Sequence, residues 1–348
     1  MAKDVRFSTV DGLKILLFMR IFLFHLGFTF CSPVWGGIQS FLVISAFLLS
    51  YKWIGKIREE VKPYHLFKRR VLRLYPAYLA VIIPISVFFV LINHKVPDDF
   101  FYYFFSAQSF YWVFTDYSSD LITFTAHTWF ITLSVYLFLL WVILLRYVPR
   151  KMLKGVCVVT IIIAFLYRTL CVLLTDSFYM SYIVPMGQMD AFAIGCLLAI
   201  NLNEDKDMLH NKRRCCWNIG IGIAGIFAFI AYLAAKKNVS LWSAYIVGDF
   251  AGDPLTVNIF FFISLMGAGL IRYCLSNVSH PILGSDLLVK LGTWIYVLYL
   301  FHWPIIQITK SFVDSKFLVG PISLILVITC AYLWDKYIEP HTKKLLYR

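Results

Sequence analysis

The 348-residue chain is 60% apolar, 18% aromatic and only 15% charged, with a mean hydropathy of +0.76. One water-soluble core could not bury that much apolar surface, so the composition predicts an integral membrane protein. The formal net charge of +13 does not indicate nucleic-acid binding, because Lys and Arg gather with Trp and Tyr in short segments between apolar runs, where lipid headgroups would contact them.

Apolar runs recur along the whole chain, with no internal repeat, no low-complexity tract and no loop long enough to form a soluble domain. The chain is therefore predicted to be all-α and polytopic, a single transmembrane domain over residues 1–348. A span needs roughly 20 apolar residues. On that rule we expect about ten transmembrane helices, near residues 15–33, 37–55, 76–94, 128–146, 153–174, 180–202, 216–235, 255–274, 288–309 and 317–335.

The first apolar run is interpreted as a span and not as a cleavable signal peptide, because residues 1–14 are polar and charged and the run is too long for an h-region. The aromatic stretch at residues 100–114 is too short to cross, and we expect it along the outer interface, where Tyr and Trp are favoured. The chain ends soon after the last predicted span, so we expect the protein to act alone or with a separate partner.

Lys and Arg collect in alternate loops, as the positive-inside rule describes. With a cytosolic N-terminus, the outer segments hold only Lys95, Lys236, Lys237, Lys310 and Lys316, beside most of the loop aspartates. This asymmetry predicts cytosolic termini at both ends, an even number of spans and a multi-pass location in the plasma (inner) membrane.

The eight cysteines show no spacing typical of a metal site and mostly lie inside apolar runs. We therefore expect no metal and interpret most of them as packing residues. Cys215 and Cys216 border a basic loop and would be candidates for acylation in a eukaryotic host.

A few ionisable side chains fall inside the predicted spans, where charge is costly and usually functional. They are Arg20, His25, Arg168, Asp190 and His302. The alternative is structural: Arg20 or Arg168 pairs with Asp190, and the histidines bond to backbone carbonyls. The residues alone leave both interpretations open.

Lys14 and His25 are expected to share one helix face, because eleven residues at ~100° each come to about three turns plus 20°. They would lie roughly 16 Å apart along the axis, with Lys14 at the cytosolic mouth and His25 in the middle of the bilayer. A cation can hold a phosphate, and a neutral imidazole can take a proton from a hydroxyl. The spacing suits a ligand with an anionic head and a long thin arm, such as an acyl-coenzyme A.

A second basic group precedes the third predicted span, in the segment HLFKRRVLRLYPAY. Arg69 and Arg73 lie about one helical turn apart there, with Arg70 beside them. The group is interpreted either as a set of lipid-headgroup contacts or as a clamp for nucleotide phosphates, which Arg binds with two hydrogen bonds.

Six segments, in order along the chain, resemble motifs of the acyltransferase-3 family of membrane O-acyltransferases. DGLKILLFMRIFLFH resembles the opening motif, with Lys14 where arginine is commoner, and IQSFLVISAFLLS resembles the second, with Ser45 matched and Ala46 in place of glycine. FKRRVLRLYPAY is similar to the basic motif, and HTWFITLSVYLF to the His-x-Trp segment, with His127 and Trp129 matched. The last two segments, QMDAFAIGCLLA and LGTWIYVLYLFHWPII, keep Asp190, Gly195, Tyr296, Tyr299, His302 and Pro304. Two departures concern the acceptor: Ser134 stands where many members have glutamate, and Gln188 where many have arginine.

The resemblance implies transfer of an acyl group, most often acetyl, from cytosolic acyl-CoA to a hydroxyl of a cell-surface polysaccharide, glycolipid or related acceptor. By analogy, His25 would be the catalytic histidine and Lys14 its partner. The donor side would be formed by Arg69, Arg70, Arg73 and Ser45. The acceptor side would be formed by His127, Trp129, Asp190, Tyr299 and His302. Whether His25 acts as general base or carries the acyl group stays open, since both roles use the same nitrogen.

Another class also fits buried His, Arg and Asp: a transporter or flippase for a glycan or lipid-linked precursor. Transport that needs no acyl-CoA would distinguish it, whereas a purely structural scaffold would leave these groups without purpose. The expected partners are acyl-CoA, a glycan or lipid-linked glycan acceptor and membrane lipids, with no nucleic acid. Acceptor contacts are expected in the outer loops at residues 95–127 and 236–254.

Overall fold

The computed structural model describes residues 7–31, 35–54, 56, 62–175, 177–205, 212–247, 252–276 and 280–346. Every regular element in these ranges is helical, which confirms the predicted all-α class. The longer helices are α1 (Ser8–His25), α2 (Trp35–Trp53), α4 (Pro63–Asn93), α8 (Trp129–Tyr147), α9 (Leu153–Thr175), α11 (Met189–Glu204), α12 (Lys212–Lys237), α14 (Ile259–Ser276), α16 (Ile295–Lys310) and α17 (Lys316–Leu333). The shorter ones are α5 (Phe100–Phe104), α6 (Gln108–Phe114), α7 (Ile122–Thr125), α10 (Phe178–Tyr182), α13 (Leu241–Val247), α15 (Asp286–Thr293) and α18 (Glu339–Leu346).

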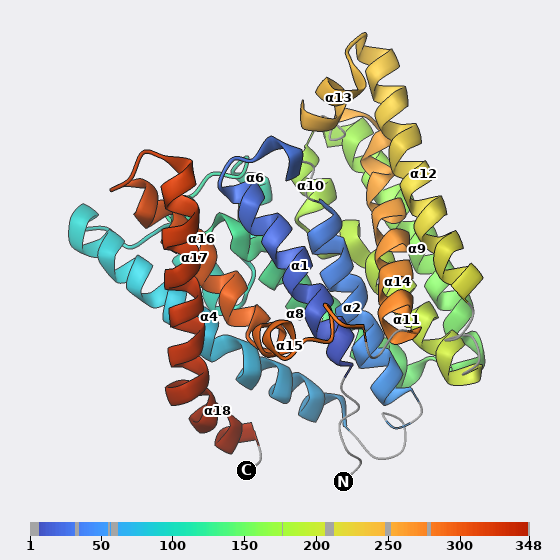
Figure 1. The fold of residues 1–348 in the computed structure, drawn as a ribbon, viewed down its shortest axis with the longest axis horizontal. Coiled ribbons are helices and arrows are strands. Elements are labelled where there is room, and N and C mark those ends of the chain that lie inside the picture. Colours follow the sequence, from blue (N-terminus) through green and yellow to red (C-terminus); the bar gives the residue numbers. More distant parts are fainter. Residues whose placement is uncertain are drawn as a thin grey trace.

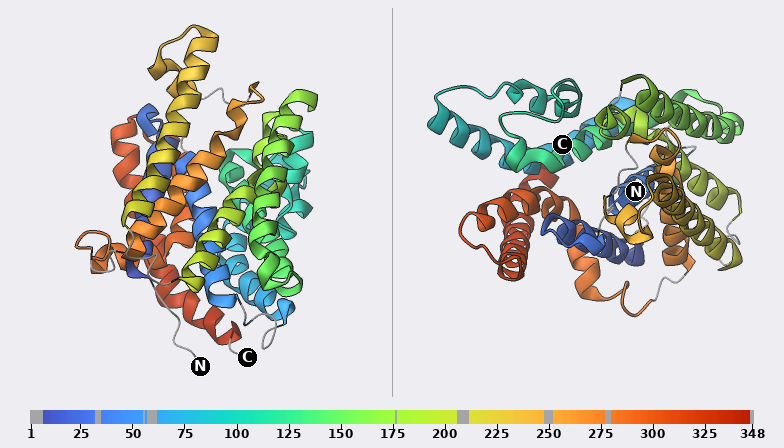
Figure 2. Two further views of the ribbon diagram at one scale, coloured as in Figure 1. Left: turned by 90° about the vertical axis from the view of Figure 1, so that its right-hand side faces the viewer. Right: turned by 90° about the horizontal axis from the view of Figure 1, so that it is seen from above.

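The long helices run in alternating directions between two ends of a bundle (Figure 1). The basic end holds α15, α18 and the start of α1, and its lysines include Lys154 and Lys290, which pair with Glu204 and Asp335 at 2.5 and 2.8 Å. The far end holds α6 and α13. Helices α1 and α2 run through the interior, while α12 runs along one edge (Figures 1 and 2).

Seven helical segments of the described chain are long and apolar enough to cross a bilayer, which supports a multi-pass membrane protein. They are Pro63–Asn93, Ile122–Tyr147, Arg150–Thr175, Pro185–Glu204, Cys216–Lys237, Thr256–Ser276 and Lys316–Thr342. Helices α5 and α6 are not among them, in agreement with the prediction that residues 100–114 do not cross. The expected total of ten spans stays a prediction.

The predicted span at 15–33 is wrong in its bounds, because α1 begins at Ser8 and ends at His25. The cause is Gly27, whose φ of +89° is a left-handed conformation that glycine adopts without strain. The amide of Gly27 bonds to Phe24 O at 2.7 Å and that of Phe28 to Leu23 O at 3.1 Å, which is the Schellman pattern of a helix end. His25 therefore lies in the last turn of its helix and not midway along a span.

The predicted span at 288–309 is interrupted. Helices α15 and α16 meet at Trp294 at an angle of 73°. Gly292, just before the bend, lies so close to helix α1 that an added Cβ would come within 2.3 Å of Asp11 O. The short arm α15 therefore packs on the first turn of α1, while α16 continues through the bundle.

Small residues bring the interior helices together. A Cβ on Gly195 of α11 would come within 2.4 Å of Val43 O and 2.8 Å of Ala46 Cβ, both on α2. Close backbone approach through small side chains is how helices pack tightly where lipid leaves no hydrophobic driving force. The family segments around Ala46 and Gly195 therefore meet each other, and their packing positions α2 beside the site.

Candidate active site

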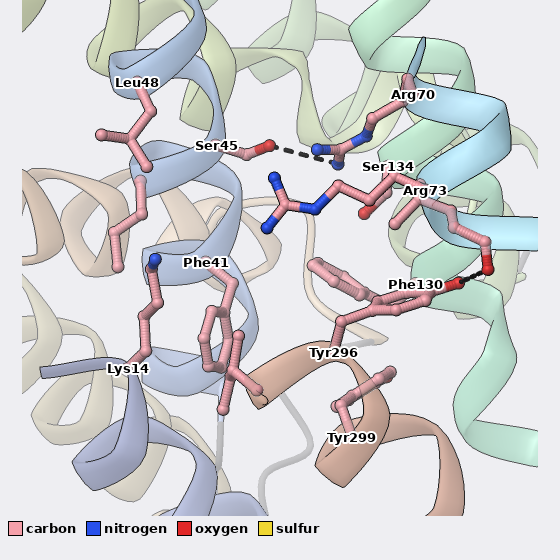
Figure 3. A pocket seen from close by; sticks show the side chains of 13 residues that line it. Lys14, Phe41, Ser45, Leu48, Arg70, Arg73, Phe130, Ser134, Tyr296 and Tyr299 are labelled. Carbon is pink, nitrogen blue, oxygen red and sulfur yellow. Dashed lines mark hydrogen bonds between the residues drawn. The ribbon is translucent and has the colours of Figure 1, made fainter. Parts of the chain in front are cut away.

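A cavity of about 210 Å³ lies between α1, α2, α4, α8 and α16, and we call it the cationic cavity. Three cations line it: Lys14 from α1, and Arg70 and Arg73 from α4. Their charged ends point into the same space (Figure 3). Lys14 Nζ is paired with Asp11 Oδ1 at 2.8 Å on its own helix, but no acidic side chain is among the lining residues, so the cavity keeps the positive charge that a phosphate-bearing ligand requires.

Arg70 is held by contacts with two other helices. Its guanidinium donates to Ser45 Oγ on α2 at 3.4 Å and lies over the Phe138 ring of α8, 4.9 Å from the centroid. Its buried Nε has no hydrogen-bond partner among the described residues. A buried N–H that is left unbonded is costly, so this donor is suited to an incoming anion.

Aromatic side chains close the cavity at the end away from Arg70 (Figure 3). Phe130 of α8 and Tyr299 of α16 pack with ring centroids 5.3 Å apart, and we call this pair the aromatic layer. The Tyr299 hydroxyl donates to His127 O at 2.6 Å, and the Tyr296 hydroxyl to Leu74 O at 2.9 Å. Both tyrosines are therefore fixed to backbone atoms of neighbouring helices.

Three histidines lie behind the aromatic layer and form the histidine cluster: His25, His127 and His302. The His302 ring centroid is 5.3 Å from that of Tyr299 and 5.2 Å from those of both His25 and His127. The His25 ring also lies 4.4 Å from Trp303. Tyr299 thus lines the cationic cavity and also contacts the rings of His302 and His127, so the cavity and the histidine cluster adjoin through this side chain.

Hydrogen bonds fix the protonation of two of these rings. His127 Nε2 bonds to Leu300 O at 2.9 Å and His302 Nδ1 bonds to Tyr299 O, and because a carbonyl only accepts, each of these nitrogens carries a proton. In the neutral rings the other nitrogens are acceptors, and both are buried without a partner in the described residues. The cluster therefore holds two proton acceptors beside His25.

Hydrogen bonds from two tyrosines hold the segment that precedes His127. The Tyr117 hydroxyl donates to Ala126 O at 2.8 Å, and Tyr103 shares a 2.6 Å hydrogen bond with Thr125 Oγ1. Burial raises the pKa of both tyrosines, so they stay protonated. The predicted outer loop thus positions one member of the histidine cluster.

Asp190 lies outside the cavity and the cluster, in a fully buried ion pair with Arg168 at 2.8 Å. Arg168 also donates to Gly187 O at 2.7 Å and to Asn258 Oδ1 at 3.1 Å. This matches the structural alternative for these two charges. An acceptor contact by Asp190 would compete with the ion pair, and it stays a prediction.

The structure brings most of the predicted site residues into two adjoining groups. Lys14, Ser45, Arg70, Arg73 and Tyr299 line the cationic cavity, and His25, His127 and His302 form the histidine cluster. Arg69 is exposed and does not line the cavity, and Trp129 packs instead on Tyr182, with ring centroids 4.7 Å apart. No set of three or more His, Cys, Asp or Glu within the described ranges is arranged to hold a metal.

The predicted site residues do not include all of the lining; Phe130, Ser134 and Tyr296 are among the lining residues that were not assigned to the site, although Tyr296 was matched as a motif residue. Tyr296 lies one helical turn before Tyr299, so its i, i+3 spacing could have assigned it to the same site. Ser134 had been noted only as a departure from the family pattern. It lies in the wall of the cationic cavity, whereas the other departure, Gln188, accepts a 3.2 Å hydrogen bond from Gln39.

Apolar helices around a cationic cavity, with histidines one layer behind it, define the class as a multi-pass membrane protein with a site suited to group transfer. The family model described as Acyltransferase domain matches residues 7–334, and the chain belongs to this acyltransferase-3 family. This match confirms the resemblance and the predicted acyltransferase class.

Two curated relatives are named as O-acetyltransferases. The chain is 24% identical over 345 residues to the peptidoglycan O-acetyltransferase OatA of Listeria monocytogenes, and 25% identical over 333 residues to the O-acetyltransferase OatA of Staphylococcus aureus. Each alignment covers 90% of this chain and 52% of the relative, so the chain spans about half the length of these proteins. No solved structure matches the chain.

Proposed function

We propose that the protein transfers an acyl group, acetyl in the first instance, from cytosolic acyl-CoA to a hydroxyl of a cell-wall glycan, with peptidoglycan the acceptor class that the relatives' names favour. The observation that carries this proposal is the arrangement of the cationic cavity, the aromatic layer and the histidine cluster in series. A phosphate-bearing donor and a hydroxyl acceptor need such separate sites around one nucleophilic nitrogen.

The donor is assigned to the cationic cavity. Its volume of about 210 Å³ is below the ~300–1,000 Å³ of sites that enclose a whole drug-sized ligand, so it fits a thin part of the donor such as the pantetheine arm. Lys14, Arg70 and Arg73 bind phosphate oxygens, with Ser45 orienting Arg70. Arg69 meets the donor's phosphates at the basic end, outside the cavity.

The reaction is assigned to His25. As a general base it takes the proton of the acceptor hydroxyl, whose oxygen attacks the thioester carbonyl; the C–S bond breaks and CoA leaves as a thiolate that regains the proton. As an acyl carrier, it takes the acyl group from CoA first and passes it to the hydroxyl. His302 and His127 accept hydrogen bonds or protons beside it, and Trp129 and Asp190 shape the acceptor side.

We further propose that the chain crosses the plasma membrane ten times, with both termini in the cytosol. The alternating helix directions and the location of α18 and the start of α1 at the basic end support this topology (Figure 1). The bent pair α15–α16 is taken as an eighth span. The two interior helices α1 and α2 complete the count, because protein and not lipid surrounds much of their polar surface: Asp11, Gln39 and Ser50 are all buried.

Transfer of radiolabelled acetyl from acetyl-CoA to cell-envelope glycans tests the assignment. Membranes with the wild-type protein should label a glycan fraction, and His25→Ala should remove the label while the protein still reaches the membrane. His341→Ala is the matched control, because His341 is exposed on α18. Full labelling by the His25→Ala variant would rule out the catalytic role.

A single-turnover measurement separates the two roles of His25. Without acceptor, a carrier releases one CoA per protein and retains the acyl group, whereas a general base releases none until the acceptor is added. Measuring free thiol before and after adding glycan distinguishes the two.

A further inference from the structure

The lining of the cationic cavity changes from polar to aromatic along two of its helices. Phe41 of α2 and Phe130 of α8 line the cavity, and Ser45 and Ser134 line it four residues later on the same helices. Four residues make about one helical turn, or ~6 Å. Because the long helices alternate in direction and α1 starts at the basic end, α2 and α8 both run toward that end (Figure 1). The two rings therefore lie about one turn farther from the basic end than the two hydroxyls.

Three rings form a continuous surface at this level, and we call them the three-ring floor: Phe41, Phe130 and Tyr299. Phe130 contacts the other two, with its ring centroid 6.4 Å from that of Phe41 and 5.3 Å from that of Tyr299. The ring planes meet at 60° and 65°, the edge-to-face arrangement that aromatic pairs prefer. Tyr299 is also held by its hydrogen bond to His127 O, so one member of the floor is fixed to backbone.

The donor of the proposed reaction would place its acyl group against this floor. Coenzyme A has its phosphates at one end of the pantetheine arm and its thioester at the other. The cations that meet the phosphates include Arg70, and the rings close the cavity at the end away from Arg70 (Figure 3). Acyl carbons beyond the thioester carbonyl therefore point at the rings, at the level where Tyr299 adjoins His127 and His302.

A packed aromatic surface at the end of the acyl group discriminates by chain length. Acetyl has a single methyl group beyond its carbonyl, and propionyl and butyryl each add a methylene. A methylene that a packed site cannot hold displaces either the rings or the reacting carbonyl, and one methylene in an apolar pocket changes kcat/KM by roughly 10–200-fold. The cavity of about 210 Å³ also has to hold the pantetheine arm, which leaves little space for a longer chain.

We propose that the three-ring floor limits the transferred group to acetyl and that Phe130 is the specificity-determining residue. Phe130 is the ring that contacts both of the others, so its side chain bounds the largest part of the floor. Tyr299 has a second task, because its hydroxyl holds the backbone of His127. This inference rests on the proposed acyl-CoA reaction and extends it to the length of the acyl group and the side chain that limits it.

The test compares acetyl-, propionyl- and butyryl-CoA as donors, with membranes that hold the full chain, cell-envelope glycan as the acceptor and release of free CoA thiol as the readout. The wild type should have a kcat/KM for acetyl-CoA ~10-fold or more above that for butyryl-CoA. Phe130→Ala should bring the two values within ~3-fold of each other. Phe130→Leu should relax the limit for propionyl-CoA more than for butyryl-CoA.

Phe229→Ala is the matched control. The Phe229 ring is also half-buried and packs edge-to-face on another ring, that of Phe262 at 5.4 Å, but it does not line the cavity. This variant should keep the wild-type ratio between donors. Because the three donors share one coenzyme, a variant that only weakens phosphate contacts or reduces the amount of folded protein should lower all three values by the same factor.

Phe130→Leu keeps most of the packed volume and decides the test if Phe130→Ala does not reach the membrane. Equal kcat/KM of the wild type for acetyl- and butyryl-CoA, wild-type ratios in the folded Phe130 variants, or an equal loss of selectivity in Phe229→Ala would each overturn the proposal while leaving the acyl-transfer reaction in place. Release of thiol from none of the three donors by the wild type would overturn the proposed function, and the length limit with it.

Discussion

Removing the carboxylate of Asp190 should be among the most destabilising single changes in the chain. Asp190→Ala leaves the Arg168 guanidinium fully buried, with hydrogen bonds to Gly187 and Asn258 but without its counter-ion. Breaking a buried ion pair from one side costs ~3–5 kcal/mol, because the remaining charge stays desolvated. The free energy of unfolding should fall by about that amount.

Unfolding in mixed micelles by added dodecyl sulfate, followed by tryptophan fluorescence, measures this loss. Glu204→Ala is the control, because the Lys154–Glu204 pair is 46% exposed on both sides and should contribute less than ~1 kcal/mol. The double variant Arg168→Met with Asp190→Leu should be more stable than Asp190→Ala, since it removes both charges. A loss no larger than that of Glu204→Ala would refute the reasoning.

The same double variant also decides whether Asp190 contacts the acceptor. If the pair is structural, a folded double variant keeps glycan labelling, because neither charge lines the cationic cavity. Loss of labelling in a variant with wild-type stability and unchanged donor KM would instead assign Asp190 to the acceptor site.

Three further changes test the site and its support. Tyr299→Phe removes the hydrogen bond to His127 O and should lower the free energy of unfolding by ~1 kcal/mol. It should also lower kcat while changing the KM for the donor less; an unchanged kcat would show that this hydrogen bond has no role in turnover. Arg70→Ala should raise the KM for acetyl-CoA at least tenfold and Arg70→Lys less, and equal effects on donor and acceptor KM would remove Arg70 from the donor site. Gly195→Val should lower the unfolding midpoint by several degrees, because its side chain meets Val43 O; an unchanged midpoint would show that α2 and α11 can separate freely.

Local pattern was enough to predict most helices and to single out Lys14, Arg70 and Arg73, which line one cavity. Lys14 and the basic segment of α4 are near the basic-end termini of their helices, where hydropathy and charge together indicate a membrane interface. The composition also identified the membrane class, because a water-soluble core could not bury this much apolar surface.

The histidine cluster could not be predicted from hydrophobic periodicity, because its members are far apart in the sequence. His127 and Tyr299 are joined by a hydrogen bond between residues 172 positions apart, and only the family resemblance placed them in one site. The end of α1 was missed for a local reason: the apolar run continues past Gly27, and hydropathy does not register a left-handed backbone. The bend at Trp294 likewise follows from packing against α1.

The position of the aromatic layer also matters for the ion gradient across the membrane. A site open to both faces of a membrane would let protons and other ions leak along it, and the leak would discharge the gradient with every turnover. Phe130 and Tyr299 both line the cationic cavity and pack on each other, and the Tyr299 hydroxyl is held by its hydrogen bond to His127 O. In the proposed reaction, packed rings at this position would restrict the passage of water through the site, so that an acyl group could cross from one face to the other without the protein acting as a channel.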